Sequence, residues 1–120
     1  MNYKISIPSS GQYVLCKVHE VVTVELSRQF IIDTHRLGCE RNIMRFLFDV
    51  RGHQNIEEPH KIYKFTHEDM GVLKLDKTAR VAILVSPDDR SHDFVETVNL
   101  NAGHNIKVFR EKKDAISWLS

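Results

Sequence analysis

The run MRFLFDV at residues 44–50 is the most informative part of the sequence, because it is apolar and has almost no polar alternation. A second run of the same kind, VAILV, occupies residues 81–85. Short runs of this kind are typical of strands that are covered on both faces, as in the parallel sheets of α/β proteins. We therefore predict that these two strands form the centre of a parallel sheet.

Helical patterns lie on either side of the first buried strand. Before it, the spacing of apolar residues predicts a helix that begins after an N-cap at Thr23 and runs to about residue 40. After it, a second helix is predicted from about residue 57 to about residue 70. Acidic residues and Pro59 suit its first turn, and Gly71 is placed to end it.

The second buried strand is followed by a sequence typical of a helix start. The predicted N-cap and first three helical positions are Ser86, Pro87, Asp88 and Asp89. The apolar face of this helix is predicted at Phe94, Val95, Val98 and Ala102, and Gly103 suits a left-handed C-cap. A last strand over residues 106–109 and a short helix over residues 115–119 complete the pattern.

The N-terminal residues alternate between polar and apolar side chains. Residues 2–7 and 12–18 both show this period of two, and a polar turn separates them, which predicts an antiparallel hairpin at one edge of the sheet. The fold class is therefore α/β, with a mixed five-stranded sheet, about four helices and one domain over residues 1–120. The alternating edge leaves a homodimer open, although Lys4 makes this edge a poor template for pairing.

Composition narrows the classes of function. The chain has 120 residues, and 17 Lys and Arg against 16 Asp and Glu give a formal charge of +1, which does not favour nucleic acid as a partner. The two cysteines form no C-x-x-C pair and no signal peptide is apparent, so we expect a cytoplasmic protein. The basic stretch between residues 61 and 80 is interrupted by acidic residues, and it predicts a solvated face or, at most, peripheral contact with lipid headgroups.

Several segments in this order resemble a known family. They are FLFDVRG at residues 46–52, YKF at 63–65, ARVAILV at 79–85, NAGHNIKVF at 101–109 and AISWL at 115–119. The chain resembles the bacterial SpoIIAA-like family, small relatives of the STAS domains of anti-sigma factor antagonists, whose fold is also compared with CRAL-TRIO-type lipid-carrying domains. The resemblance covers residues 43–119 well and the N-terminal part loosely. It implies a non-enzymatic binding or regulatory module that works through a protein partner or, alternatively, carries or senses a small apolar ligand or lipid at the membrane surface.

One departure from the STAS pattern affects this expectation. STAS antagonists carry an Asp-Ser motif after a central strand, and phosphorylation of that serine breaks the complex with the partner. Here Asp49 is followed by Val50 and Arg51, and residues 52–55 offer no hydroxyl group. We therefore predict that the phosphorylation switch is absent.

The predicted binding residues follow from the position of strand ends. Ligands of open α/β sheets gather at the carboxyl ends of parallel strands, where this chain places Asp49, Arg51 and His53 after one strand, Ser86 and Asp88 after the next, and Arg110 after the last. We expect these segments to share one rim. Asp49 and Arg51 suit either binding or loop ordering, and Ser86, Asp88 and Asp89 suit structural caps.

The second predicted helix offers a different kind of site. The resemblance implies that this helix acts as a mobile lid, in which case Ile56, Ile62, Phe65, Val72 and Leu73 would line an apolar pocket. The alternative is that these side chains are ordinary core.

Catalytic and metal chemistry find little support in the sequence. His60 and His67 would lie about 10.5 Å apart along a helix, too far to share one ion, so no metal or cofactor is expected. There is no Gly-x-Ser-x-Gly motif, and Cys16 alternates within a predicted strand, where a thiol usually acts as a small hydrophobic group. A hydrolase using Ser86 or His92 is the weakest hypothesis, because no oxyanion device accompanies them.

Overall fold

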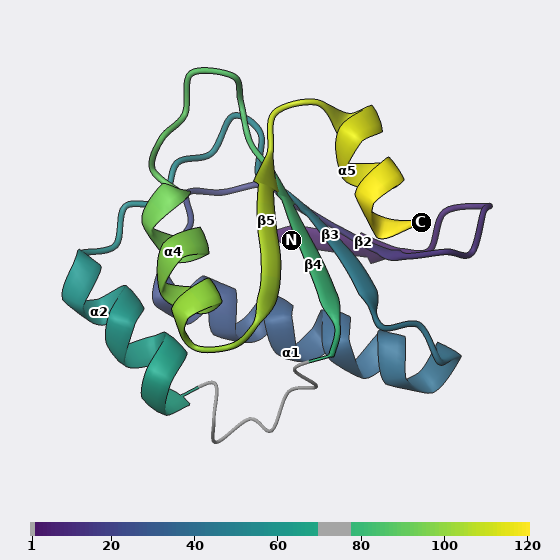
Figure 1. Cartoon of the computed structure of the whole chain (residues 1–120), viewed down its shortest axis with the longest axis horizontal. Helices are drawn as coiled ribbons and strands as arrows, with labels where there is room; N and C mark the ends of the chain where they lie inside the picture. Colours follow the sequence, from purple (N-terminus) through teal and green to yellow (C-terminus); the bar gives the residue numbers. More distant parts are fainter. Residues whose placement is uncertain (1, 70–77) are drawn as a thin grey trace.

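Five strands form one mixed sheet with helices on both faces (Figure 1). The computed structural model describes residues 2–69 and 78–120. The strands are β1 (Tyr3–Ser6), β2 (Val14–Val18), β3 (Arg45–Asp49), β4 (Arg80–Leu84) and β5 (Asn105–Phe109). The described helices are α1 (Val24–Arg41), α2 (Pro59–Lys64), the π-helical turn η1 (Phe65–Asp69), α4 (Asp93–Asn101) and α5 (Lys112–Leu119).

The strand order is β1-β2-β3-β4-β5, with β1 and β2 antiparallel and the other neighbours parallel. This confirms the predicted α/β fold, including the hairpin at one edge and the two buried strands at the centre. The pairing of Phe46 with Val81, and of Val81 with Ile106, places these three side chains in one row across the sheet.

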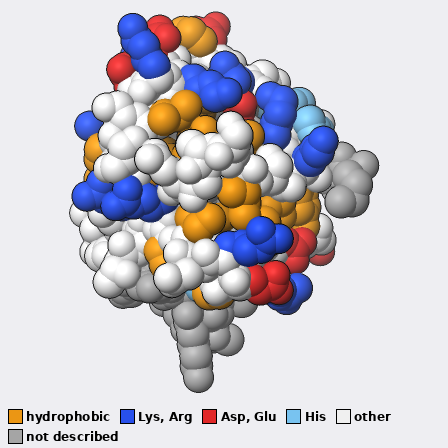
Figure 2. Space-filling view, turned by 90° about the vertical axis from the view of Figure 1, so that its right-hand side faces the viewer, with side chains coloured by type: hydrophobic (Ala, Val, Ile, Leu, Met, Phe, Trp, Pro, Cys, Tyr) orange, Lys and Arg blue, Asp and Glu red, His pale blue; other side chains and the backbone are white. Residues whose placement is uncertain are grey.

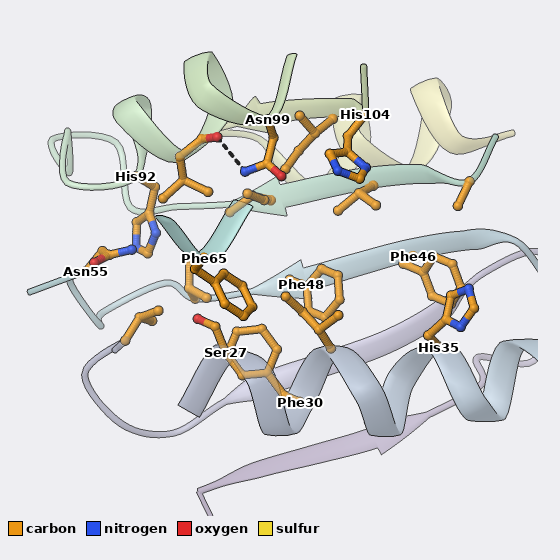
Figure 3. Close-up of a pocket in the computed structure, with 18 of the residues that line it drawn as sticks. Ser27, Phe30, His35, Phe46, Phe48, Asn55, Phe65, His92, Asn99 and His104 are labelled. Atoms are coloured by element: carbon orange, nitrogen blue, oxygen red, sulfur yellow. Dashed lines mark hydrogen bonds between the residues drawn. The ribbon is translucent and has the colours of Figure 1, made fainter. Parts of the chain in front are cut away.

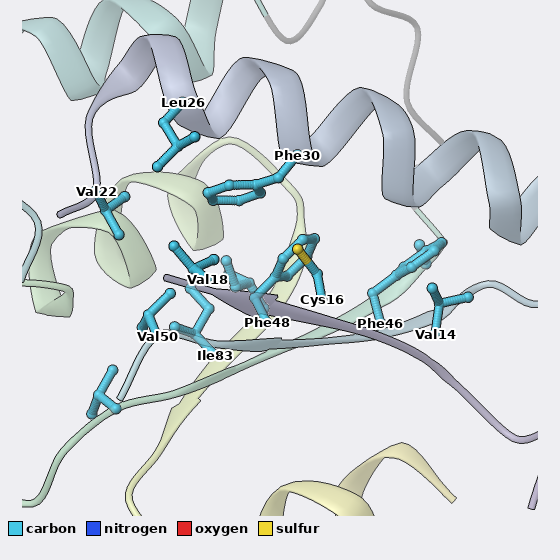
Figure 4. Packing of buried hydrophobic residues seen from close by; sticks show 13 residues of the cluster. Val14, Cys16, Val18, Val22, Leu26, Phe30, Phe46, Phe48, Val50 and Ile83 are labelled. Carbon is cyan, nitrogen blue, oxygen red and sulfur yellow. The ribbon is translucent and has the colours of Figure 1, made fainter. Parts of the chain in front are cut away.

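The alternation of side chains along each strand separates two cores. Phe46 and Phe48 of β3 point to the face that α1 and α4 cover, where Phe48 meets Phe30 of α1 and Phe46 meets His35 (Figure 4). Leu47, between them in sequence, points to the opposite face and packs in the cluster that contains Leu119 of α5. The face covered by α1 and α4 carries the larger core, and α2 packs beside α4 on this side (Figure 1).

Two arginines hold the C-terminal end of α5 against the sheet. Arg45 Nη1 donates to the carbonyl of Leu119 at 2.6 Å, and Arg80 Nη1 donates to that of Trp118 at 2.9 Å. The last carbonyls of a helix have no partner within the helix and carry partial negative charge, so cationic donors stabilise them. The starts of β3 and β4 thus fix the position of α5.

A glycine allows α1 to lie close to β3. A Cβ atom at Gly38 would lie 2.4 Å from the backbone oxygen of Ile43 and 2.7 Å from the ring of Phe46. The chain turns directly after this contact, where Asn42 adopts a left-handed φ of 58°. Only a residue without a side chain fits this approach.

Most predicted helix boundaries agree with the structure. Thr23 is the N-cap of α1 and accepts a hydrogen bond from the Leu26 amide at 3.1 Å. Pro59 begins α2 as predicted. After α4, Gly103 adopts a φ of 90°, and the amide of His104 donates to the carbonyl of Asn99, as in a Schellman C-cap. The expected helix end at Gly71 lies outside the described residues.

The prediction that Ser86 caps a helix was wrong. Helix α4 begins at Asp93, and residues 86–89 form a turn in which the Asp89 amide donates to the Ser86 carbonyl. The hydroxyl of Ser86 instead accepts a hydrogen bond from the Gly52 amide at 2.8 Å. Tertiary pairing between two strand-end loops therefore displaces the local capping pattern. Phe94, predicted on the buried face, is 40% exposed.

Candidate functional site

The segments that follow β3, β4 and β5 meet at one rim of the sheet, as expected from the strand directions. The bond from the Gly52 amide to Ser86 joins the first two segments. Arg110 Nη2 joins the third, because it donates to the Asp89 carbonyl at 3.0 Å and lies 3.4 Å from Asp93 Oδ1. The rim is thus tied together by bonds within the chain.

Asp49 is the most strongly bound carboxylate of the rim. It is 5% exposed, and Arg51 donates to it from Nε at 3.0 Å, from Nη2 at 2.8 Å and from its own amide at 3.2 Å. Lys17 Nζ lies 3.3 Å away on β2. Burial by itself would raise the pKa of Asp49, but the hydrogen bonds and charge of Arg51, with the charge of Lys17, outweigh burial and lower it. This pair orders the loop after β3.

The other predicted rim residues differ in their surroundings. The carbonyl of His53 lies 3.1 Å from His92 Nε2, which links the rim to the start of α4. Asp88 is exposed in the turn after β4, whereas its neighbour Asp89 is buried. Burial opposes ionisation of Asp89, yet hydrogen bonds from Ser91 and the charges of His92 and Arg110 lower its pKa. Among the residues predicted for the rim, Arg51 and Asp88 are the exposed charged side chains.

An apolar cavity of about 130 Å³ lies beside the rim, between the sheet and α1, η1 and α4 (Figure 3). Its walls include the rings Phe30, Phe46, Phe48 and Phe65. Two smaller residues also line the cavity: Val81, which lies on β4, and Ala79, which directly precedes β4. Phe46 and Phe48 come from β3, whereas Phe30 and Phe65 come from α1 and η1, so aromatic rings line the cavity on both the sheet side and the helix side.

Polar side chains gather on the α4 wall of the cavity. In Figure 3, His92, Asn99 and His104 lie along one side, and the phenylalanine rings lie across the space from them. Asn99 Nδ2 donates to the Val95 carbonyl at 2.8 Å. The cavity is therefore apolar over most of its surface, with these polar groups near α4 and with Ser27 and His35 contributed by α1.

The outcome for the predicted pocket residues is mixed. Phe65 lines the cavity, and its ring also lies 5.5 Å from the guanidinium carbon of Arg28. Ile62 is buried but is absent from the cavity walls, and Ile56 is 59% exposed. The predicted contributions of residues 72 and 73 lie outside the described residues.

The cavity contains residues that the sequence reasoning missed. The sequence pattern placed Phe30 on the apolar face of the first helix and Phe48 in a buried strand, but it assigned neither residue a role in ligand binding. Asn99 was not singled out, although it lies four residues after Val95 and thus on the same face of the helix. A buried-face position occupied by an amide is the signal that could have revealed it.

The structure also bears on metal binding, on the reactivity of Cys16 and His92, and on membrane spanning. Across residues 2–69 and 78–120, no group of three or more His, Cys, Asp or Glu side chains is arranged to hold a metal ion. Burial raises the pKa of the Cys16 thiol to about 11. His92 Nε2 faces the His53 carbonyl and Asp89, at 3.1 and 3.6 Å. Within the same residues, no helix is both long enough and apolar enough to span a membrane.

The outer surface carries mixed charge. Figure 2 views the side near α5 and the β1–β2 turn, and shows Lys and Arg side chains spread among hydrophobic and uncharged ones. Two cations near α5 and β5 lie over aromatic rings: Arg80 lies 5.8 Å from the ring centre of Trp118, and Lys107 lies 5.4 Å from that of Phe109. In such contacts the cation is attracted to the face of the ring, which holds these two side chains against the protein surface.

A scan against protein-family models and searches of curated proteins and of solved structures found no match to this chain. The likeness to the SpoIIAA-like family therefore stays a prediction, and the functional argument depends on the geometry of the cavity.

Proposed function

We propose that the chain is a non-catalytic binding module that carries or senses a small apolar ligand in the cavity between the helices and the sheet. The supporting observation is the apolar cavity of about 130 Å³. The cavity is partly open, so water reaches its apolar walls. Apolar surface that is removed from water contributes roughly 25 cal/mol per Å², so an apolar occupant that covers these walls stabilises the protein. This gain favours a ligand site over a packing defect.

The volume limits the size of the ligand. A buried apolar cavity of about 150 Å³ accommodates benzene, so this cavity suits a molecule with one ring or a short branched chain. A larger lipid would fit only with movement of a wall. The function proposed here therefore favours small apolar compounds over whole lipids.

Binding is favoured over hydrolysis by the surroundings of the candidate nucleophiles. The hydroxyl of Ser86 accepts from the Gly52 amide, and His92 Nε2 faces a carbonyl and a carboxylate. Neither arrangement places a base against a hydroxyl, as nucleophilic catalysis requires. Cys16 is buried, and its raised pKa keeps the thiol protonated at neutral pH.

The experiment that tests the proposal is native mass spectrometry of freshly purified protein beside its denatured mass. A retained small molecule is the expected result. For protein that has lost its ligand, toluene serves as a probe, and at one hundred times its Kd it should raise the free energy of unfolding by about 2.7 kcal/mol. No retained mass, together with a Tm that toluene leaves unchanged, would contradict the proposal.

A STAS-like module that regulates a protein partner is the second candidate. The exposed charges of Arg51 and Asp88 favour it, because both project from loops that the Gly52–Ser86 bond holds together. A photo-crosslinker at position 88 tests it against the same group at Lys4, on the edge strand β1. A partner captured equally from both positions, or from neither, would contradict a rim-specific role.

We also propose a cytoplasmic location, peripheral membrane contact at most, and no nucleic-acid partner, on the basis of composition and mixed surface charge.

A homodimer through β5 is disfavoured, because Glu96 Oε2 accepts from the Val108 amide of this edge strand at 2.6 Å. Fractionation and analytical ultracentrifugation would test these points.

A further inference from the structure

The side chain of Asn99 has an orientation that the structure fixes. It is only 5% exposed and lines the cavity. Its Nδ2 atom lies 2.8 Å from the Val95 carbonyl oxygen and 3.5 Å from Thr66 Oγ1. A carbonyl oxygen can only accept, so the amide nitrogen must face Val95 and the amide oxygen must face the other way.

The amide oxygen of Asn99 is left with unused acceptor capacity. Both hydrogens on Nδ2 are engaged, whereas no residue in the described part of the chain donates to Oδ1. Figure 3 shows this oxygen pointing away from the dashed bond to Val95, toward the cavity. Because Asn99 lines the cavity, a molecule bound there can donate a hydrogen bond to this accessible amide oxygen.

The opposite walls restrict the rest of the ligand. Phe48 and Phe65 lie across the cavity from Asn99 (Figure 3), and these rings offer contacts to an apolar body. A carboxylate or phosphate would be repelled by an amide oxygen and would lose its hydration among apolar side chains. The part of the cavity between Asn99, Phe48 and Phe65 therefore suits a neutral molecule.

We propose that the ligand is a small neutral ring compound with one hydrogen-bond donor, a hydroxyl or an N–H group, that donates to Asn99 Oδ1. This inference rests on the proposed function, because it names the chemical class that the same cavity binds. The donor supplies the partner that Oδ1 lacks, and the ring fills the apolar space. Asn99 thereby selects among apolar molecules of equal size.

Phenol and toluene are the probes that test the inference, because a hydroxyl replaces a methyl group of similar size. Isothermal titration calorimetry on the wild-type protein should give a Kd for phenol about tenfold lower than that for toluene, since a matched donor–acceptor pair outweighs the loss of hydration. In Asn99→Leu, which replaces the amide with an apolar group of similar shape, the preference should reverse in favour of toluene.

The control is Asn101→Leu on the exposed side of the same helix. It should keep the wild-type ratio of the two Kd values. A second measurement uses only the wild-type protein and so does not depend on whether the variant folds. Phenol should shift the side-chain ¹⁵N resonance of Asn99, and toluene should leave it nearly unchanged.

The outcomes separate this inference from the proposed function. If both probes bind the wild-type protein equally well, or if Asn99→Leu changes both Kd values in parallel, donor recognition by Asn99 is overturned while the cavity stays a binding site. If neither probe binds, the proposed function and the inference both fail.

Discussion

Replacement of Val81 by Phe should stabilise the protein and block its cavity. Val81 lies on β4, is partly buried and lines the cavity. Its neighbours in the sheet, Phe46 and Ile106, also line it, so a ring at position 81 extends from the central strand into free space. The strand tolerates an aromatic residue, because aromatic side chains have high β-propensity.

The magnitude follows from the apolar surface that the ring removes from water. If the ring and the cavity walls together lose about 60 Å² of exposed apolar surface, the recovered free energy is about 1.5 kcal/mol at roughly 25 cal/mol per Å². For a domain of this size, such a gain raises Tm by about 6 °C. The same substitution should weaken the binding of toluene at least tenfold, because ring and ligand compete for one space.

Urea denaturation gives the change in stability, and calorimetry with toluene gives the change in affinity. Val18→Phe is the matched control, because Val18 is fully buried on the same sheet face and does not line the cavity. There, overpacking should cost about 1–3 kcal/mol. If Val81→Phe destabilises the protein as much as Val18→Phe does, the space beside Val81 is not free and the reasoning is wrong.

Three further predictions concern the helices and the rim. Gly38→Ala gains about 1 kcal/mol of helix propensity but forces a methyl group against the Ile43 backbone oxygen, so urea denaturation should show a net loss of about 2 kcal/mol. The lowered pKa of Asp49 means that its contribution to stability is complete above about pH 3.9, its unfolded value, and is lost as pH falls through the lower folded pKa. Asp49→Asn should therefore be less stable than wild type at pH 7 and lose less stability between pH 5 and pH 2, whereas the exposed Asp88→Asn should follow wild type across that range. Arg28→Ala removes an ion pair to η1 and should increase both hydrogen exchange at residues 65–69 and the dissociation rate of toluene, with α4 unchanged; equal effects on α4 would contradict a local role.

The central part of the fold could be predicted because its signals are local and strong. The runs at residues 44–50 and 81–85 lack polar alternation, and burial on both faces is the physical cause of that pattern. The helix start at Ser86 could not be predicted in the same way. Ser86 and Pro87 satisfy every local rule for an N-cap, but the hydroxyl of Ser86 is held by the amide of Gly52, 34 residues earlier. Long-range hydrogen bonds of this kind leave no periodic trace in the sequence.

The candidate site was predictable only in part for a related reason. The rim follows from the direction of parallel strands, so Asp49, Arg51 and Ser86 were expected to be neighbours, and they are joined through the bonds of the rim. A cavity, in contrast, depends on the difference between the volume that side chains fill and the volume that the backbone encloses. Phe65 marks one wall, but nothing in a single sequence shows that Val81 opposite it leaves space.

The walls of the cavity differ in how firmly the chain holds them. Helix α4 is fixed to the sheet at its start by Arg110, along its length by the bond from the Val108 amide to Glu96, and at its end by the Gly103 cap. The η1 wall is held through Arg28, which lies 2.6 Å from Asp69 and over the Phe65 ring, in an ion pair whose side chains are 41% and 34% exposed. Exposed ion pairs contribute about 0–1 kcal/mol, much less than the combined bonds of α4. Phe65 and Thr66 of η1 are themselves buried, and Thr66 Oγ1 lies 3.5 Å from Asn99 Nδ2, so packing and this contact also hold η1 against α4. Asn99, the proposed recognition group, therefore lies on the wall that side-chain hydrogen bonds tie to the sheet, and the Arg28→Ala variant measures how far the position of the η1 wall depends on the ion pair alone.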